Sequence, residues 1–400
     1  MTEREPMKVA QRALRAEPFH AMSIGQRASE LEAGGAHVVK LSLGEPDFGA
    51  PPAVREAMVD AMDGRPLPYT PAMGLPALRE EIAGYYREVH GVAVDPARII
   101  VTSGASAALL LATAATTDPG DEVVMADPSY PCNRELVQAF GGEVVAVPTT
   151  PATRFQLDAS LVDAAWTERT ASVMVATPSN PTGTAIPFDE LERVCRLARE
   201  RGAWRIVDEI YLDLQDDAPD GTPARSVLAI DPGAIAIGSF SKFFGMTGWR
   251  LGWAVLPENL VDAAERLAVN FFLCASTPAQ IAATAAFTDE SLALCAERRA
   301  EFQRRRAFVL PALADLGLPV GAAPDGAFYA YCDVSSTGLD AWTFCRRALD
   351  EAHVAITPGR DFSTATGETH VRISYAAAEG ELREGIRRLG RLIDGLSSAT

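Results

Sequence analysis

Lysine is rare in this sequence, and one lysine occupies a setting suited to chemistry. The chain has three lysines, Lys8, Lys40 and Lys242, whereas arginine supplies the other 33 of its 36 basic residues. Lys242 follows an apolar run and lies between Ser239 and Arg250. A lysine reacts as the free amine, which an apolar and positively charged environment favours. We therefore expect that Lys242 forms an imine with an aldehyde cofactor; the alternative is a solvent-facing loop lysine. Ser239 and Arg250 suit an anionic group such as phosphate.

Two further apolar runs end in polar side chains. Asp208 follows the run Arg205–Val207, and Tyr211 comes three residues later. A carboxylate at the end of a buried strand needs a partner, unless it is simply a helix N-cap. A carboxylate, a phenol and a lysine together suit a pyridine cofactor, because the acid keeps the ring nitrogen protonated and the phenol donates to the ring oxygen. Asn180, in the turn Thr177–Gly183, is a candidate second donor to that oxygen; the alternative is a plain Pro/Gly turn.

A run of small residues, Thr102-Ser-Gly104-Ala105-Ser106, leads directly into an expected helix over 107–116. Backbone N–H groups at such a strand-to-helix turn form a phosphate cradle. The glycine patterns of dinucleotide-binding and P-loop proteins are absent from the sequence. Cysteine and histidine are scattered, without CxxC or HExxH spacing, so we expect no metal site.

The composition of the chain is that of an ordinary globular protein. Its 400 residues carry a net charge of −17, which argues against nucleic-acid binding because phosphates would be repelled. The N-terminus lacks the apolar core of a secretory signal, and the longest apolar stretch is too short to span a bilayer, so no membrane partner is expected. Six scattered cysteines suggest reduced thiols and a cytoplasmic location.

Short apolar runs alternate with helical segments from about residue 98 onward. This pattern predicts an α/β fold in which a mostly parallel, seven-stranded sheet is sandwiched by helices. The expected strands are Ile99–Thr102, Glu122–Ala126, Val144–Val147, Ser172–Thr177, Arg205–Val207, Ala234–Ser239 and Leu251–Leu256. Ligand sites of such sheets lie at the carboxyl ends of the strands. We expect a large domain over 46–290, a smaller α+β domain over 291–400, and an N-terminal segment, 1–45, that joins the smaller domain.

Taken in order, these motifs resemble those of the class I/II pyridoxal-phosphate-dependent aminotransferase family, fold type I. The likeness covers nearly the whole chain and comprises GEPDF at 44–48, the Tyr69 turn, SGAS at 103–106, DPSYP at 127–131, SNPTG at 179–183, DEIY at 208–211, SFSK at 239–242, GWRLG at 248–252, GAFY at 326–329, PG at 358–359 and VRIS at 371–374. The resemblance implies pyridoxal 5'-phosphate as cofactor and transfer of an amino group from an L-amino acid to a 2-oxo acid.

The resemblance also implies roles for individual residues. Lys242 would hold the cofactor as an internal aldimine and, once released by the substrate amine, would move the proton while the reaction passes through aldimine and ketimine intermediates. Asp208 would pair with the ring nitrogen, and Tyr211 and Asn180 would bond the ring oxygen. The remaining cofactor contacts would come from Tyr130, stacked on the ring, from Tyr69 of a partner subunit in a homodimer with shared active sites, and from a phosphate cradle of Gly104, Ala105, Ser106, Ser239 and Arg250. Arg372 would clamp the substrate carboxylate, helped by Gly44 and Asn180, although its VRIS run alone equally suits a structural salt bridge.

The expected substrate is less sharply defined. Some bacterial aspartate-type members carry a lysine where this chain has Ser106, so neutral or aromatic amino acids are favoured, with aspartate as a further candidate. Ile24, Tyr329 and the pair Phe271-Phe272 are candidates to line an apolar substrate pocket, or else core residues. The main alternative is a fold-type I lyase or decarboxylase acting on an amino acid. Two other classes are disfavoured. A cofactor-responsive regulator would need a DNA-binding module, and a nicotinamide oxidoreductase would need the glycine fingerprint; this sequence shows neither.

Overall fold

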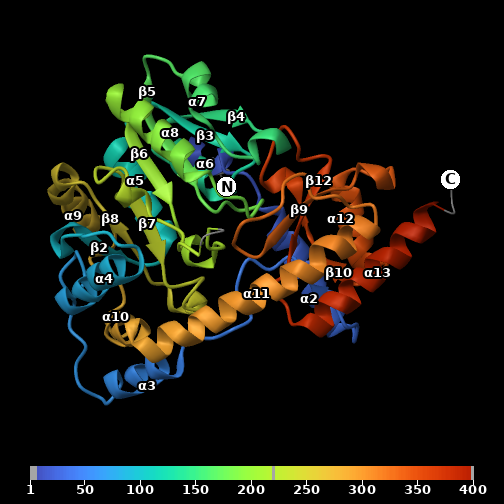
Figure 1. Ribbon diagram of the computed structural model, residues 1–400, viewed down its shortest axis with the longest axis horizontal. Helices are drawn as coiled ribbons and strands as arrows, with labels where there is room; N and C mark the ends of the chain where they lie inside the picture. The colour runs from blue at the N-terminus through green and yellow to red at the C-terminus, as the bar shows by residue number, and fades with distance from the viewer. Residues whose placement is uncertain (1–6, 219–220, 398–400) are drawn as a thin grey trace, which may run out of the picture.

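A computed structural model describes residues 7–218 and 221–397 of the chain (Figure 1). Two parts are apparent, a larger one built around a central sheet and a smaller one that contains the C-terminal helix. Within these residues, short 3₁₀ helices join the main elements at Pro96–Arg98, Pro151–Thr153, Leu212–Leu214, Val227–Ala229, Thr247–Trp249, Thr284–Phe287, Ser335–Thr337 and Gly359–Asp361.

The central sheet has seven strands in the order β2-β8-β7-β6-β5-β3-β4. Their bounds are β2 Ile99–Thr102, β3 Glu122–Asp127, β4 Glu143–Pro148, β5 Thr170–Ala176, β6 Trp204–Asp208, β7 Ile235–Ser239 and β8 Gly252–Val255. Each runs close to its predicted range. β8 is antiparallel to both of its neighbours, β2 and β7, and the other pairs are parallel. The prediction of a mostly parallel, helix-covered α/β sheet is confirmed.

Helices cover both faces of this sheet because its strands are apolar on both sides. One face packs α5 Ala105–Thr116, α6 Pro131–Ala139 and α9 Glu258–Phe272 against alternate strand residues such as Val123 and Met125. The opposite face, which includes Val124, packs α3 Pro52–Ala61, α4 Pro76–Val89, α7 Ala159–Ala165, α8 Phe188–Glu200 and α10 Thr277–Ala283. Helix α5 is buried between the sheet and α9, so its first turn is held rigidly at the sheet edge.

The smaller part has a separate core built from both ends of the chain. It contains α2 His20–Ala33, β1 Val39–Lys40, β9 Tyr329–Asp333, α12 Ala341–Asp350, β10 Val354–Ala355, β11 Thr357–Pro358, β12 His370–Ser374 and α13 Glu379–Ser397. β1 pairs with β10, and β11, β12 and β9 form an antiparallel sheet. The short helix α1 Gln11–Arg15 precedes α2.

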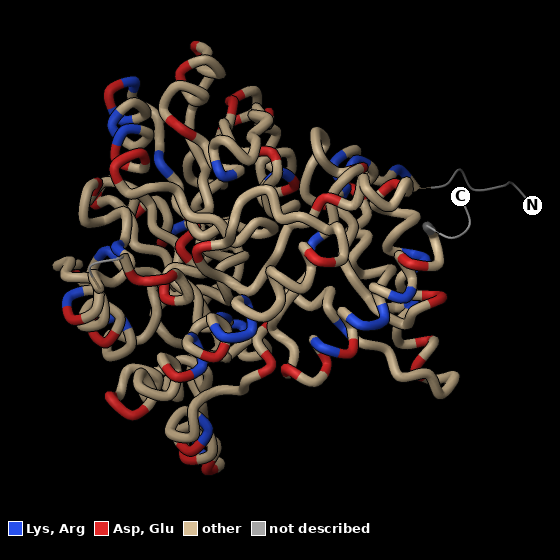
Figure 2. Tube along the Cα trace, turned by 45° about the vertical axis from the view of Figure 1, so that its right-hand side comes forward, with Lys and Arg blue, Asp and Glu red and all other residues tan. Residues whose placement is uncertain are grey.

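A long helix, α11 Asp289–Asp315, runs between the two parts (Figure 1). It contributes Cys295 to one core of the larger part and Phe302 to the core of the smaller part. The division of the chain at residues 45 and 290 therefore stays a prediction, since α11 begins near the boundary and belongs to both cores. Acidic and basic residues are interspersed on the outer helices (Figure 2), where many form ion pairs three or four residues apart.

Candidate active site

A cavity of about 970 Å³ opens at the carboxyl edge of the central sheet, between the two parts. This volume is at the upper end of the range typical of small-molecule sites. Its walls combine sheet-edge residues with residues of the smaller part, including Gly44, Ala105, Ser106, Tyr130, Asn180, Asp208, Tyr211, Ser239, Lys242, Arg250, Tyr329 and Arg372. Most of the predicted site residues thus meet in one cavity.

Lys242 and Arg250 lie on the single connection between β7 and β8. This connection starts and ends at the same rim of the sheet, because Ser239 and Gly252 are paired across the antiparallel strands. The Lys242 Nζ donates a hydrogen bond to the Gly44 carbonyl oxygen at 2.6 Å. Burial, and then the nearby positive charge of Arg372, lowers the pKa of Lys242 to about 8. A pKa of about 8 leaves roughly a tenth of this amine neutral at pH 7, far more than an ordinary lysine would have, and the neutral form is the one that a nucleophile or proton acceptor requires.

Asp208 is the last residue of β6 and is 3% exposed. Burial raises the pKa of its carboxyl group to about 6, although a bond from the Ile210 N–H and the charge of Lys242 act in the opposite direction. The Ile210 N–H, at 3.2 Å, is the only hydrogen-bond donor to this carboxylate among the described residues. Asp208 is not a helix cap, since the next helix begins after Tyr211. A buried carboxylate with so few partners suits a cationic N–H group of a ligand.

An anion cradle forms where β2 meets α5. Gly104 has a φ of +83°, and a Cβ there would lie 2.6 Å from Arg250 Nη2, so the guanidinium group packs directly over this glycine. The first N–H groups of α5, at Ala105 and Ser106, have no partner within the helix. Arg250 donates to the Thr247 carbonyl oxygen at 3.1 Å and has no carboxylate within 4.0 Å among the described residues. Together with Ser239, these groups match the donor set that a phosphate needs.

Arg372, on β12, is a second guanidinium group without an acidic partner. Its Nη1 donates to Asn180 Oδ1 at 2.9 Å and its Nη2 to the Ser42 carbonyl oxygen at 2.7 Å. The side chain is 3% exposed, and its Nε has no hydrogen-bond partner among the described residues. It forms no ion pair within the described part of the chain, which argues against a structural salt bridge. A buried and unpaired cation facing a cavity is suited to the carboxylate of a small ligand.

Two tyrosines complete the floor of the cavity. The hydroxyl groups of Tyr211 and Tyr329 are 2.8 Å apart and share a hydrogen bond. Burial raises the pKa of both phenols, so each stays protonated and able to donate. The ring of Tyr329 also lies 4.5 Å from the Arg372 guanidinium carbon, a cation–π contact. Tyr329 is therefore placed where the sequence predicted a substrate-binding residue.

Five predicted contacts are not among the residues that line this cavity. One of them, Gly104, is covered by the Arg250 guanidinium group. Ile24 is 3% exposed and packs in the core of the smaller part, so its pocket-lining role is not supported. Phe271 and Phe272 lie at the end of α9, where Phe271 stacks on Phe140. Tyr69 is 80% exposed and does not line the cavity of its own chain.

Other residues in and just before α2 line the cavity in place of Ile24. Phe19, just before α2, and Met22, Gln26 and Ser29 on it line the cavity. Ala21, Ser23, Gly25 and Ala28 line the cavity as well, so the lining is not confined to one helical face. No spacing in the sequence would have separated these residues from Ile24.

Comparison with known proteins identifies the class of enzyme that this fold and site define. A model of the aminotransferase class I and II family matches residues 36–389. The chain therefore belongs to the class I and II aminotransferase family.

Similar proteins carry the names of aminotransferases, and the matches cover nearly their whole length. A valine–pyruvate aminotransferase of Mycobacterium tuberculosis is 41% identical over 374 residues, which cover 93% of this chain and 95% of the relative. An aspartate/prephenate aminotransferase of Thermus thermophilus is 36% identical, covering 94% and 96%. The crystal structure of an aminotransferase from M. tuberculosis superposes with a TM-score of 0.93 at 40% identity, covering 98% of this chain and 100% of that one.

This protein is accordingly an aminotransferase of fold type I, and transamination is favoured over the lyase and decarboxylase alternatives. Within residues 7–218 and 221–397, no group of histidine, cysteine and acidic residues could hold a metal ion. No helix in the same ranges is both long and apolar enough to cross a membrane.

Proposed function

We propose that the enzyme uses pyridoxal 5'-phosphate to transfer the amino group of a neutral L-amino acid to a 2-oxo acid. The observation that carries this proposal is the convergence of three groups on one cavity: the Lys242 amine with a lowered pKa, the buried Asp208 carboxylate, and the unpaired Arg372 guanidinium group. None of the three forms an ion pair among the described residues, and each matches one part of a cofactor–substrate pair.

The residues present fit this cofactor. The cradle of Gly104, Ala105, Ser106, Ser239 and Arg250 would hold the phosphate, and Asp208 would hold the ring nitrogen. Tyr211 and Asn180 would contact the ring oxygen, and Tyr130 would stack on the ring. When bound, the cofactor supplies an aldehyde carbon for the amine and a ring that accepts electrons.

The chain's own side chains would then do three kinds of work. Arg372 would bind the substrate carboxylate through its guanidinium fork and so orient the bond between the α-carbon and its hydrogen. The Lys242 Nζ, whose pKa is lowered to about 8, would take the proton from that α-carbon and pass it to the carbon that the cofactor supplies. Asp208 would remain negative above about pH 6 and thereby hold a proton on the nitrogen it faces.

The preference for a neutral substrate follows from the cations of the cavity. Among its lining residues the cations are Lys40, Lys242, Arg250 and Arg372. Lys40 is paired with Glu32 at 2.7 Å, and the other three are assigned above. No lining cation of this chain is left for a second substrate carboxylate, whereas Phe19, Met22, Leu109 and Ile210 offer apolar surface. The likeness to the valine–pyruvate enzyme supports the same choice.

A homodimer with shared sites is part of the proposal. Tyr69 is 80% exposed, and Leu67, Phe271 and Leu273 are also exposed apolar side chains. Such surfaces suit burial against a second copy, in which Tyr69 would reach the partner's phosphate site. A mixture of Lys242→Ala and Tyr69→Ala subunits tests this: mixed dimers hold one site with both changes and one with neither. Recovered activity is expected; none would count against shared sites.

The function itself is tested by single-turnover spectroscopy. The cofactor-loaded enzyme is mixed with valine, alanine, phenylalanine, aspartate or glutamate, and loss of the visible absorbance is followed. Neutral donors are expected to react fastest, and each converted donor should appear as its oxo acid without free ammonia. If only the acidic donors react, the proposed substrate class is wrong.

The cytoplasmic location expected from cysteine usage stays a prediction, supported by six cysteines that form no disulfide.

A further inference from the structure

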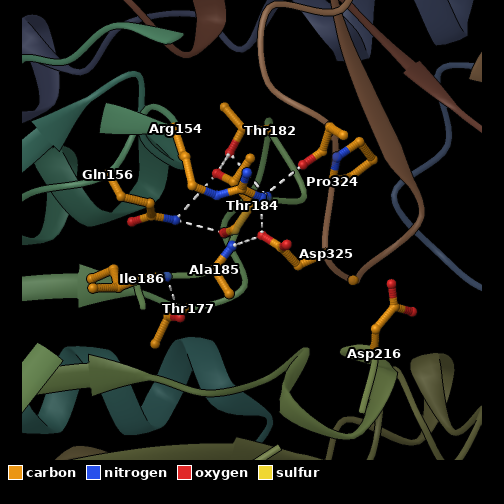
Figure 3. A network of polar contacts seen from close by, with 12 residues as sticks. Arg154, Gln156, Thr177, Thr182, Thr184, Ala185, Ile186, Asp216, Pro324 and Asp325 are labelled. Carbon is orange, nitrogen blue, oxygen red and sulfur yellow. Dashed lines mark hydrogen bonds and ion pairs between the residues drawn. The ribbon is translucent and has the colours of Figure 1, made fainter. Parts of the chain in front are cut away.

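The buried turn that carries Asn180 is fastened to a segment of the smaller part. The Gly183 carbonyl oxygen accepts hydrogen bonds from the N–H groups of Asp325, at 2.9 Å, and Gly326, at 3.0 Å. The Asp325 carboxylate in turn accepts from the Ala185 N–H at 2.8 Å (Figure 3). Gly183 and Ala185, both in the arm of the turn that follows Asn180, are thus held by Asp325, which is 140 positions away from Ala185 in the sequence.

The same segment also holds the chain that follows Tyr211. The Asp325 carbonyl oxygen accepts from the Asp216 N–H at 2.7 Å. At the next residue, Gly326, a Cβ would lie only 2.7 Å from the Gln215 Cα, so the two backbones are in direct contact. Asp325 therefore lies between the two segments that supply Asn180 and Tyr211 to the cavity.

The ion pair of Asp325 is not the source of this constraint. Arg154 Nη2 lies 2.5 Å from Asp325 Oδ2, but the two side chains are 36% and 35% exposed. Solvent-exposed pairs of this kind contribute between zero and about 1 kcal/mol. The Ala185 N–H, by contrast, belongs to a residue that is 6% exposed, and a buried donor left without a partner costs more.

We propose that Asp325 is a positioning residue for transamination, which fixes the 177–186 turn so that Asn180 holds Arg372 in the orientation that binds the substrate carboxylate. The proposal rests on the function proposed above. Asn180 lies three residues before Gly183, and its Oδ1 accepts from Arg372 Nη1 at 2.9 Å. Relaxation of the turn would misorient the guanidinium group, and the amino acid would bind less tightly.

A double-mutant cycle between Asp325→Ala and Asn180→Ala tests this coupling. Alone, Asp325→Ala is expected to lower kcat/KM about tenfold, mainly by raising the KM for the amino donor, because one buried donor loses its partner. In the Asn180→Ala background the same change is expected to add less than about twofold, since its route of action is already gone. Equal losses in both backgrounds would overturn the proposal, because a merely structural role is additive.

Two control variants separate the hydrogen bond from the charge. Asp325→Asn keeps an oxygen that accepts from the Ala185 N–H and should stay within about threefold of the wild-type kcat/KM. Asp163→Ala breaks a comparably exposed ion pair with Arg201, remote from the cavity, and should leave KM unchanged. If Asp325→Asn lowered kcat/KM as much as Asp325→Ala does, the hydrogen bond to the Ala185 N–H would not be the cause of the loss, and the proposal would fail.

Two further outcomes keep the result interpretable. Should Asp325→Ala fail to fold, the cycle is repeated with Asp325→Ser, whose shorter side chain does not reach the Ala185 N–H; additivity there overturns the proposal equally. If the wild-type enzyme transaminates no amino acid, the proposed function is wrong. If the wild type is active but the cycle is additive, only the role of Asp325 is wrong.

Discussion

The wall of the cavity formed by the central sheet differs from the wall formed by α2. The sheet wall is polar and buried: Asp208 is 3% exposed and Ser239 6%. The α2 wall mixes apolar and polar side chains and is more open, with Met22 70% exposed. Sheet topology fixes the first wall, because the ends of parallel strands meet at one rim. The second wall depends on where a single helix of the smaller part packs. We infer that the sheet wall carries the chemistry and the α2 wall selects among substrates.

The strongest challenge to this contrast is removal of the reacting amine. Lys242→Ala should lower the single-turnover rate by at least the 10²–10⁴-fold that is typical of general acid–base catalysis. The change leaves the α2 wall intact, so the amino donor should still bind, which is measured by titrating the donor and following the visible absorbance of the bound cofactor. As a control, Lys40→Ala, which breaks the pair with Glu32, should keep most of the activity. Turnover retained by Lys242→Ala would contradict the assignment.

Asp208 offers a test of the buried charge of the sheet wall. Burial raises its pKa in the folded chain from 3.8 to about 6, so protonation favours the folded state. The stability from this group is fully present below about pH 4 and is lost as the pH rises through about 6, by roughly 2–3 kcal/mol. In cofactor-free protein, Asp208→Asn should remove this loss. The Tm of the variant relative to that of the wild type should therefore rise between pH 4 and 7. A constant difference would argue against a buried carboxylate.

Arg372 sharpens the contrast, because it binds substrate but belongs to the smaller part. Arg372→Lys keeps the charge and loses the planar fork. We expect kcat/KM to fall by an amount equivalent to about 1.5–3 kcal/mol of lost stabilisation, the range for hydrogen bonds to charged groups. The fall should come mainly from a higher KM for the amino donor. Steady-state kinetics with valine and alanine measure this. An unchanged kcat/KM would remove Arg372 from the site.

The smallest effects separate a core residue of α2 from a cavity-lining one. Ile24→Val should cost about 0.5–1.5 kcal/mol of unfolding free energy, as is usual for a trimmed core residue, and leave KM unchanged. Met22→Ala should leave the unfolding free energy within about 0.5 kcal/mol, since the side chain is largely exposed, but should alter the ranking of neutral donors. Denaturant unfolding and a donor panel on both variants decide the matter. The reverse pattern would mean that α2 does not select substrate.

The sequence alone supports the sheet wall far better than the rest of the site. Asp208 and Lys242 each follow an apolar run, and a parallel sheet brings such run ends together whatever else the chain does. Arg372 required the family resemblance, because an arginine in a short β-strand is usually part of a salt bridge. For Ile24 the sequence left a substrate pocket and the core both open, and the side chain lies in the core of the smaller part.

Asp325 was missed for a different reason. Its partners at Gly183, Ala185 and Asp216 come from other segments, and its exposed ion pair resembles many others on the surface. Nothing in its immediate neighbours marks it as part of the site, because its contacts exist only once the smaller part has packed against the sheet. Residues that act through long-range backbone contacts are not visible to pattern analysis.

The reversal of β8 has one more consequence. Because this strand runs against its neighbours, the chain leaves and re-enters the sheet at the same rim, and one short hairpin carries both Lys242 and Arg250. The amine and the phosphate-binding cation are therefore spaced by a single stretch of backbone. An insertion or deletion between them would change the reach from one to the other directly, whereas loops elsewhere around the cavity could vary in length without disturbing that spacing.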